Sequence, residues 1–477
     1  MREITHPIDG YELCGESARL IPVVANSSHE QKAVSVTLAA VHAVEEFGKD
    51  LLRSVGAPAR KTSRIDCYTE IKAAGKKTLP KDSRPDGLIV IRTGKKSWAA
   101  IVEAKVRGQQ LTEKQITDYV DLARAYNVQA VITISNDFAP RPSHHPVNVS
   151  KRKLGKLELY HWSWTYIMTE AVLKIRNHGI ADRDQAYLLA ELVRYLSHDK
   201  SGISGMDEMP SSWASICDSV RRDMRLTRSN AEVREVVNAW QELTRYVALE
   251  FSMRIGRTVT VALPSKHVKD PNARESDDIA KLCDHQILEE HFEVPDAAAK
   301  VSLTTSLKAG HVSAWMEVKA PRDRKQPKSC VTWILGQLKK VEGAEKVQVY
   351  ARFPGRTENQ CVSLDVLRED KQSLLEGAPG KMPTAFAVQC ELNLGNGISR
   401  RRKIVGEITD LVLDFYVNVG QHLRTWIPTP PQVDRPNKAG KDANTAGGSG
   451  PLIPGTEPLA SLSTSNSTDV SRFSQEP

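Results

Sequence analysis

The chain of 477 residues lacks the cysteine pairs, long apolar runs and leader pattern that mark several classes of protein. Its seven cysteines are scattered and form no Cys-x-x-Cys pair. This argues against a zinc ribbon and a disulfide framework, and fits a reducing compartment. No apolar run approaches membrane-spanning length, and the N-terminus lacks the charged-then-apolar pattern of a signal peptide. We therefore expect a cytoplasmic protein with no membrane partner.

Neither sign of charge dominates the composition. The formal net charge of +8 is small for this length, so it favours polyanionic partners only weakly. The hydrophobic fraction of 40% is that of a globular protein. A chain of this length exceeds one ordinary core, which predicts two domains.

The hydrophobic pattern predicts an α/β domain over residues 1–200. A short strand or arm is expected around residues 20–24. The pattern then predicts, in order, a helix over 30–53, strands over 65–71, 87–92 and 97–106, a helix over 112–127 with Thr112 as N-cap, strands over 128–135 and 156–161, and helices over 164–176 and 184–198. Strand, helix and strand between 97 and 135 imply a parallel crossover.

A linker over residues 201–210 precedes a second domain, which we expect to be α+β, over residues 211–427. There the pattern predicts helices over 211–224, 230–254, 331–340, 364–375 and 403–426, with strands over 258–263, 299–307, 311–319, 346–353 and 384–394. Residues 428–477 are dominated by Pro, Gly, Ser, Thr and Asn. They have too few large apolar residues to offset the entropy of ordering, which predicts a disordered tail.

The stretch from Arg84 to Tyr126 carries the candidate chemistry. Asp86 stands at the start of one expected strand, and Glu103 and Lys105 share a face near the end of the next. Two such carboxylates can reach one divalent ion, and hard cations such as Mg²⁺ and Mn²⁺ prefer oxygen ligands. The Ala104 carbonyl is a further candidate ligand. Lys105 lies where its charge can stabilise phosphoryl oxygens or hold an attacking water.

This arrangement resembles the PD-(D/E)xK nuclease superfamily, through Pro85-Asp86 and Glu103-Ala104-Lys105. Gln115 and Tyr119, one helical turn apart, are similar to the Q-x-x-x-Y signature of its exonuclease-like branch. The resemblance covers residues 28–165. It implies a restriction-endonuclease-like αβββαβ core, metal ligation by Asp86 and Glu103, and supporting roles for Gln115 and Tyr119. It also implies a glutamate on the first helix, for which Glu30 fits the inward stripe better than Glu45 or Glu46.

The second half of the chain contains a control for the short motif. Pro295-Asp296 and Glu317-Val318-Lys319 repeat it, but no apolar strand follows Asp296 and no Q-x-x-x-Y helix follows Lys319. We interpret this repeat as a coincidence. The strand–strand–helix context therefore carries more information than the motif letters.

Other residues have a functional and a plainer interpretation. His144 and His145 could bind metal or phosphate, but a surface loop is the simpler reading. His161, Trp162 and Trp164 could stack on bases, but core packing explains them. Arg400, Arg401, Arg402 and Lys403 form the sharpest basic run, at an expected helix start where cations oppose the dipole. They are the candidate nucleic-acid contacts, with Arg322, Arg324, Lys325 and Lys328 as additions, against a solvated basic turn.

The leading hypothesis is a Mg²⁺- or Mn²⁺-dependent nuclease that hydrolyses DNA, with RNA left open as substrate. The resemblance implies service in stress response, phage defence or DNA processing. Two alternatives stay open: a catalytically inactive nucleic-acid-binding or scaffold protein with the same fold, and an interaction or signalling protein acting through its second domain. A protein partner or a homo-oligomer is compatible with each.

Overall fold

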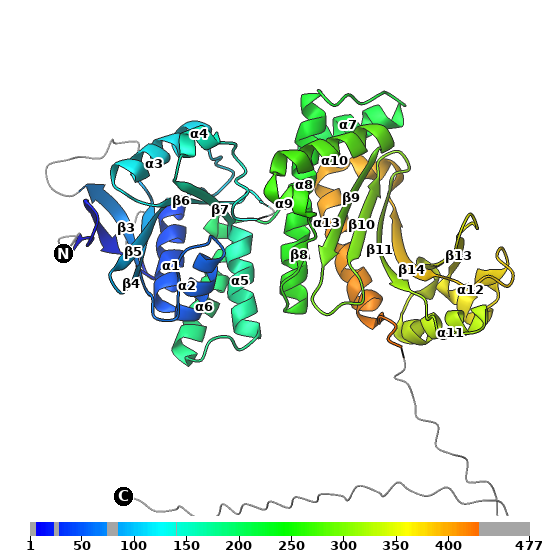
Figure 1. Cartoon of the computed structure of the whole chain (residues 1–477). Coiled ribbons are helices and arrows are strands. Elements are labelled where there is room, and N and C mark those ends of the chain that lie inside the picture. The colour runs from blue at the N-terminus through cyan, green and yellow to red at the C-terminus, as the bar shows by residue number, and fades with distance from the viewer. Residues whose placement is uncertain (1–5, 23–27, 74–83, 140, 429–477) are drawn as a thin grey trace, which may run out of the picture. The chain divides into compact units, whose positions relative to one another are not determined.

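The protein was analysed as a computed structural model, which describes residues 6–22, 28–73, 84–139 and 141–428. Residues 1–428 form one unit and residues 429–477 another. The second unit, and with it the predicted disordered tail beyond Pro428, lies outside the described residues. Within the described part, the chain is a mixed α/β structure with thirteen α-helices and two sheets of seven strands each (Figure 1).

The first sheet contains the strand that begins just after Asp86 and the strand that carries Glu103. Its strands are adjacent in chain order: β1 (His6–Pro7), β2 (Leu13–Ser17), β3 (Arg64–Ala73), β4 (Gly87–Thr93), β5 (Lys96–Ala104), β6 (Ala130–Ser135) and β7 (Glu158–Ser163). The neighbours from β1 to β5 are antiparallel, whereas β5, β6 and β7 are parallel. The crossover from β5 to β6 runs through α3 (Glu113–Ala125), so the predicted parallel connection is confirmed.

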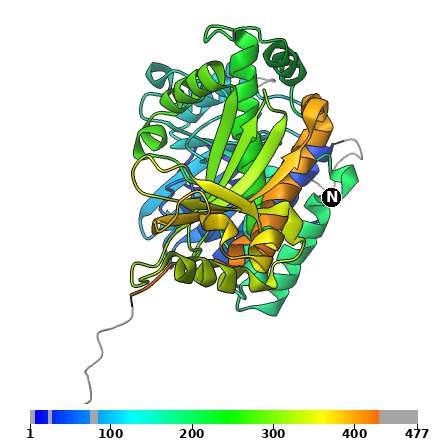
Figure 2. The same ribbon diagram turned by 90° about the vertical axis from the view of Figure 1, so that its right-hand side faces the viewer.

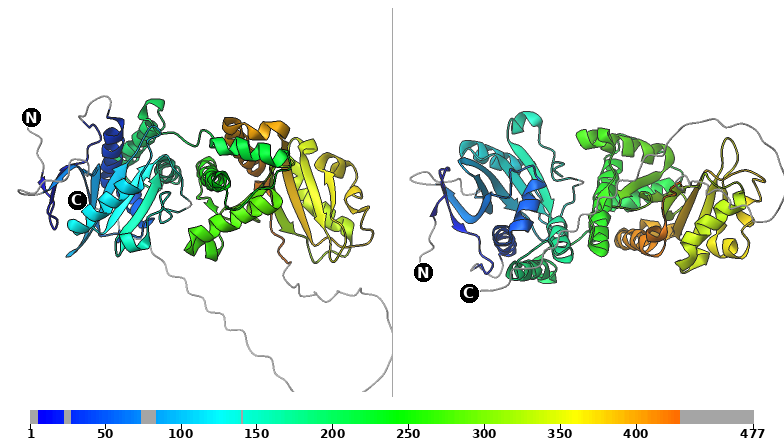
Figure 3. Two further views of the ribbon diagram at one scale, coloured as in Figure 1. Left: turned by 90° about the horizontal axis from the view of Figure 1, so that it is seen from above. Right: turned by 60° about the horizontal axis from the view of Figure 1, so that its bottom comes forward.

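Helices cover both faces of this sheet, and the alternation of β5 explains why. Ala100, Val102 and Ala104 face a core shared with four helices, and Ala99 and Ile101 face a core shared with α3. The four helices are α1 (His29–Ala43), α2 (Glu45–Arg53), α5 (Trp164–Arg176) and α6 (Arg183–Leu196). Figure 3 shows α1 and α3 on opposite sides of the sheet. A short helix, α4 (Lys151–Leu154), precedes β7.

The expectation of one continuous helix near the N-terminus is wrong. The single helix over 30–53 is two helices, because Val44 between α1 and α2 has an extended backbone with φ −104°. Gly48 permits the bend, since a Cβ there would lie 2.1 Å from the Val41 carbonyl oxygen. Of the strand or arm expected around residues 20–24, Leu20 to Pro22 form no strand and Ile21 is 85% exposed, which agrees with an arm, while 23–27 lie outside the described residues.

β5 ends two residues earlier than predicted, and the reason is local. Arg107 and Gly108 both adopt left-handed conformations, with φ 57° and 71°. Two such residues turn the chain sharply away from the sheet. Lys105 is therefore the first residue beyond the strand and lies at its end, not within it.

The second sheet is antiparallel throughout, which agrees with the expected α+β character. Its order is β13 (Gln360–Ser363), β12 (Val347–Arg352), β14 (Ala385–Asn393), β11 (His311–Lys319), β10 (Val301–Ser306), β9 (Ile287–Glu293) and β8 (Thr260–Val261). Strands β9, β13 and helices α9 (Ser265–Lys269) and α10 (Pro271–His285) were not predicted. In β9 the inward Glu290 is buried against Arg274 of α10, so a charged residue stands where the pattern expects an apolar one.

Helices line the apolar side of this sheet. They include α7 (Ser211–Arg221), α8 (Ala231–Ile255), α11 (Pro327–Gln337), α12 (Leu364–Glu369) and α13 (Arg401–Asn418). Figure 2 shows the strands in front of α8 and α13. The last predicted helix ends at Asn418 and not at 426. No helix among the described residues is long and apolar enough to cross a membrane.

The paired histidines lie in a half-exposed loop, as expected, and His145 also contacts the sheet. Thr133 Oγ1 lies 2.8 Å from His145 Nε2 and 2.8 Å from His161 Nδ1, and His161 Nε2 lies 3.0 Å from the Asp137 carbonyl. His161 and Trp162 are buried, as core packing predicts. Burial lowers the pKa of His161 to about 4 and that of His145 to about 3.

The lowered pKa values of His145 and His161 predict acid sensitivity. The unfolded chain takes up a proton on each ring below about pH 6.5, whereas the folded chain does so only near pH 4 or below, so stability falls as pH drops through this window. His161 alone contributes a loss of roughly 2 kcal/mol between pH 6.5 and 5. Urea unfolding at these two values should show a smaller drop in His161→Gln. An equal drop in the variant would contradict the assignment to this ring.

Candidate metal centre

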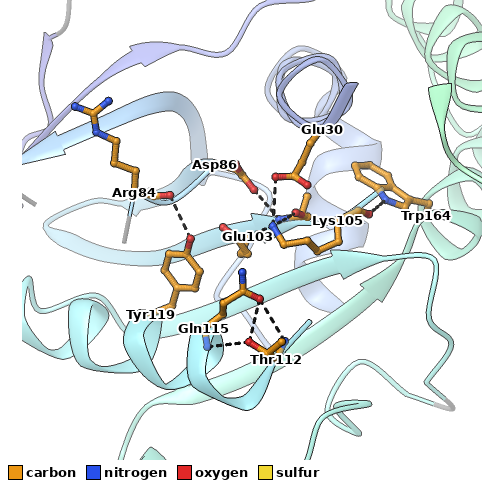
Figure 4. A network of polar contacts seen from close by, with 10 residues as sticks. Glu30, Arg84, Asp86, Glu103, Lys105, Thr112, Gln115, Tyr119 and Trp164 are labelled. Carbon is orange, nitrogen blue, oxygen red and sulfur yellow. Dashed lines mark hydrogen bonds and ion pairs between the residues drawn. The ribbon is translucent and has the colours of Figure 1, made fainter. Parts of the chain in front are cut away.

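The carboxyl end of β5 gathers four charged side chains from three elements. β4 and β5 pair with Gly87 opposite Val102, and this register brings Asp86, just before β4, beside Glu103. Gly87 also lets α1 approach, since a Cβ there would lie 2.4 Å from Leu38 Cδ1. Glu30, in the first turn of α1, completes the cluster (Figure 4).

One carboxylate oxygen from each of Glu30, Asp86 and Glu103 lies within 4.8 Å of the other two. The Lys105 ammonium lies among them. It is 2.6 Å from Glu103 Oε1, 2.9 Å from the Ala104 carbonyl oxygen and 3.3 Å from Glu30 Oε1. Asp86 Oδ2 instead accepts from the Ala104 N–H at 2.9 Å. The structure thus brings together the four charged residues that the sequence selected.

The titration of the cluster reflects burial and mutual charge. Burial raises the pKa of Asp86 well above its usual range, and the nearby Glu103 and Glu30 raise it further. Burial likewise raises the pKa of Glu30, although Lys105 opposes the shift. For Lys105, burial would lower the pKa, but the carboxylates outweigh it and the net direction is upward. The site therefore holds more negative charge than its lysine neutralises.

A divalent cation fits this imbalance. At an effective dielectric constant near 20, two carboxylate charges within 4.8 Å repel by at least about 3 kcal/mol per pair. When all three carboxylates are ionised, as cation ligation requires, they and one ammonium carry a charge of −2, which is what one divalent ion neutralises. Glu103 Oε2 is buried without a hydrogen-bond partner, an arrangement that costs free energy unless a cation or proton meets it. The donor set is all oxygen, as Mg²⁺ and Mn²⁺ prefer.

Of the two residues expected to support the site, Tyr119 lies at the site, whereas the Gln115 side chain caps the start of α3. The Tyr119 hydroxyl donates to the Arg84 carbonyl at 3.2 Å. Burial, followed by the charge of Glu103, raises its pKa, so it remains a hydroxyl at neutral pH. Gln115 Oε1 accepts from the Thr112 N–H and hydroxyl, which closes a capping box at the start of α3. Thr112-x-x-Gln115 is the sequence signature of that box, so this role was readable from the sequence.

The basic run has acidic partners in the chain. Arg401 and Arg402 bind Glu208 at 3.0 and 3.3 Å, and Lys403 lies 2.9 Å from Glu407. The negative charge of Glu208 offsets the cations at the start of α13. This reduces the unfavourable interaction of those cations with the helix dipole. Arg400 precedes this helix as its N-cap residue. Nucleic-acid binding by the run remains a prediction.

The repeated motif in the second half forms no comparable cluster. Asp296 pairs with Arg257 at 2.8 Å and Glu317 with Arg352 at 3.2 Å. Among the described residues, the only group of three acidic or metal-ligating side chains close enough to hold an ion is Glu30, Asp86 and Glu103. Comparison with protein-family models, with curated proteins and with solved structures found no match to this chain.

The excess negative charge predicts opposite effects of two neutral isosteres on stability. In EDTA at pH 8, Asp86→Asn should raise the free energy of unfolding by on the order of 1 kcal/mol, since it removes repulsion and keeps an acceptor for the Ala104 N–H. Lys105→Met should lower it by about 3 kcal/mol, because it leaves Glu103 buried and uncompensated. Chemical denaturation measures both. Destabilisation by Asp86→Asn would contradict the charge imbalance.

Divalent cations should stabilise the wild type. A cation present at 100 times its dissociation constant adds about 2.7 kcal/mol to the free energy of unfolding. Thermal shift and calorimetry with Mn²⁺ should show this gain in the wild type and lose it in Glu103→Gln. Asp296→Asn, in the repeated motif, is the matched control and should behave as wild type. Equal Mn²⁺ stabilisation in Glu103→Gln would place the cation elsewhere.

Proposed function

We propose that the chain is a metal-dependent nuclease that hydrolyses phosphodiester bonds of DNA. The observation that carries the proposal is the meeting of three carboxylates and a lysine at the end of β5, with one buried oxygen of Glu103 left without a partner. Phosphodiester hydrolysis needs a positioned water, and positive charge around the phosphoryl oxygens as the bond breaks.

Each residue has a role that its position supports. Glu30, Asp86 and Glu103 hold the cation, with the Ala104 carbonyl as a further oxygen ligand. Bound Mg²⁺ or Mn²⁺ supplies Lewis acidity at the phosphoryl group. Lys105 turns its ammonium from Glu103 to a phosphoryl oxygen or to the attacking water, and its raised pKa keeps it charged for that task. The Tyr119 hydroxyl lies beside the same carboxylates and holds the Arg84 carbonyl, two residues before Asp86.

Residues 28–165 are, in this proposal, a member of the PD-(D/E)xK superfamily. The element order α1, β3, β4, β5, α3, β6 supports it, with α2 as the second half of the bent first helix. So does the placement of Asp86, Glu103 and Lys105 at adjacent strand ends. The free amide group of Gln115 is left for substrate, since its carbonyl oxygen caps α3.

Cleavage should depend on the cation and on two residues. Linear, circular and single-stranded DNA, with RNA in parallel, should be cut in Mg²⁺ or Mn²⁺ and left intact in EDTA. Asp86→Asn and Lys105→Ala should each lower the rate at least about 100-fold, because the first weakens the cation site and the second removes positive charge at the reacting phosphoryl group. Gel assays on the purified full chain measure this.

The repeated motif provides the controls for this assay. Asp296→Asn and Lys319→Ala change the same residue types and should retain wild-type rates. Metal-dependent cleavage that survives both Asp86→Asn and Lys105→Ala would contradict the proposal. Binding of DNA without cleavage, unaffected by EDTA, would support the inactive binding protein instead.

A further inference from the structure

The main chain that carries Lys105 is held by a side chain from outside the sheet. The Trp164 Nε1–H donates to the Lys105 carbonyl oxygen at 2.9 Å, and the indole is fully buried (Figure 4). Trp164 is the first residue of α5, and its N-cap Ser163 accepts from the Tyr166 N–H at 3.0 Å. The indole N–H is therefore held in place both by β7, which ends at Ser163, and by α5, which begins at Trp164. On the other side, the Lys105 N–H donates to the Ile134 carbonyl of β6 at 2.7 Å.

A second contact holds the chain two residues further on. The Arg107 N–H donates to the Gly202 carbonyl at 2.8 Å, and the Asn136 side-chain amide lies 3.4 Å from the same oxygen. Gly202 has φ +78°, and a Cβ there would lie 2.4 Å from Arg107 Cγ. Only glycine permits this approach without displacement. Gly202 falls in the segment predicted as a linker, but the segment is docked on the end of β5.

These contacts matter because Lys105 lies beyond the last ladder residue of β5, Ala104. The left-handed Arg107 and Gly108 follow at once. Without outside partners, this turn would leave the Lys105 main chain held on one side only, by β6. Lys105 Nζ must meet Glu103 within 2.6 Å in this state and a phosphoryl group in the reaction, so a small shift of its backbone moves it out of reach.

We propose that Trp164 and Gly202 are positioning residues, which clamp the main chain from Lys105 to Arg107 and so aim the lysine at the reacting phosphoryl group. The inference rests on the proposed function for the chemistry that Lys105 performs. The clamp itself is a structural property that can be measured without any substrate. Trp164 acts through the Lys105 carbonyl and Gly202 through the Arg107 N–H, so both reach the site through the main chain that carries Lys105.

Trp164→Phe tests the clamp, with Trp162→Phe as its matched control. Trp162 is also buried, and its Nε1–H donates to Ser54 Oγ at 3.2 Å, away from the carboxylates. Both changes remove one indole N–H and the same volume. Trp164→Phe should lower kcat about 10- to 100-fold with KM unchanged and Mn²⁺ binding retained, because the ligands stay in place. Trp162→Phe should keep kcat within twofold of wild type.

Gly202→Ala provides a second variant should Trp164→Phe fail to fold. It should lower kcat at least 10-fold through displacement of Arg107. Gly256→Ala is its control, since Gly256 is equally left-handed, with φ +72°, but a Cβ there would meet only the Arg176 side chain, at 3.8 Å. Gly256→Ala should have a similar backbone strain and full activity.

Amide hydrogen exchange in the intact protein separates the clamp from the chemistry. Residues 105–107 should exchange faster in Trp164→Phe and Gly202→Ala than in wild type, Trp162→Phe or Gly256→Ala. Unchanged exchange at these residues, or equal losses of kcat in Trp164→Phe and Trp162→Phe, would overturn the inference. A wild type that cuts no nucleic acid would defeat the proposed function, while the exchange measurement would still decide whether the clamp exists.

Discussion

The buried ion pair between the Lys105 ammonium and Glu103 is the interaction on which the N-terminal site depends. Three carboxylates meet where the sheet offers little solvent, and one lysine lies among them. Such a cluster opposes folding, because desolvation and repulsion both act against it. Lys105 lowers that cost but cannot remove it. The site still lacks two positive charges, and this suits it to a divalent cation. Functional sites commonly lower the stability of the fold in this way.

The fold creates this cluster through ordinary features of a sheet. The β4–β5 register places Asp86 beside Glu103, Gly87 permits the approach of α1, and the first turn of α1 supplies Glu30. Helix α3, which connects the parallel strands β5 and β6, places Tyr119 at the same end of the sheet. Beyond the end of β5, hydrogen bonds to Trp164 and Gly202 hold the main chain from outside the strand. Precision at the site thus comes from packing around it as well as from the strands that carry its residues.

The sequence predicts the parts of this site that depend on local pattern. Strand alternation and the turn before Gly87 were enough to place Asp86, Glu103 and Lys105 together, and the helical wheel selected Glu30 over Glu45. The bend at Val44 escaped prediction because the apolar stripe continues through it, and β9 did so because Arg274 buries Glu290. The bond from Trp164 to Lys105 joins residues 59 apart, and no local pattern encodes it. The sequence pattern assigned Gln115 to the site, although Thr112-x-x-Gln115 is also the signature of a capping box.

The central claim is that a divalent cation binds among Glu30, Asp86 and Glu103. Anomalous diffraction from crystals grown with Mn²⁺ tests it most directly, because it locates the ion without reference to any activity. The account predicts a single strong peak in contact with oxygens of these three residues, including the Oε2 of Glu103 that has no partner here, and a Lys105 ammonium turned away from Glu103. A density map in which Lys105 still bridges Glu103 and Glu30, with no peak between the carboxylates, would contradict it.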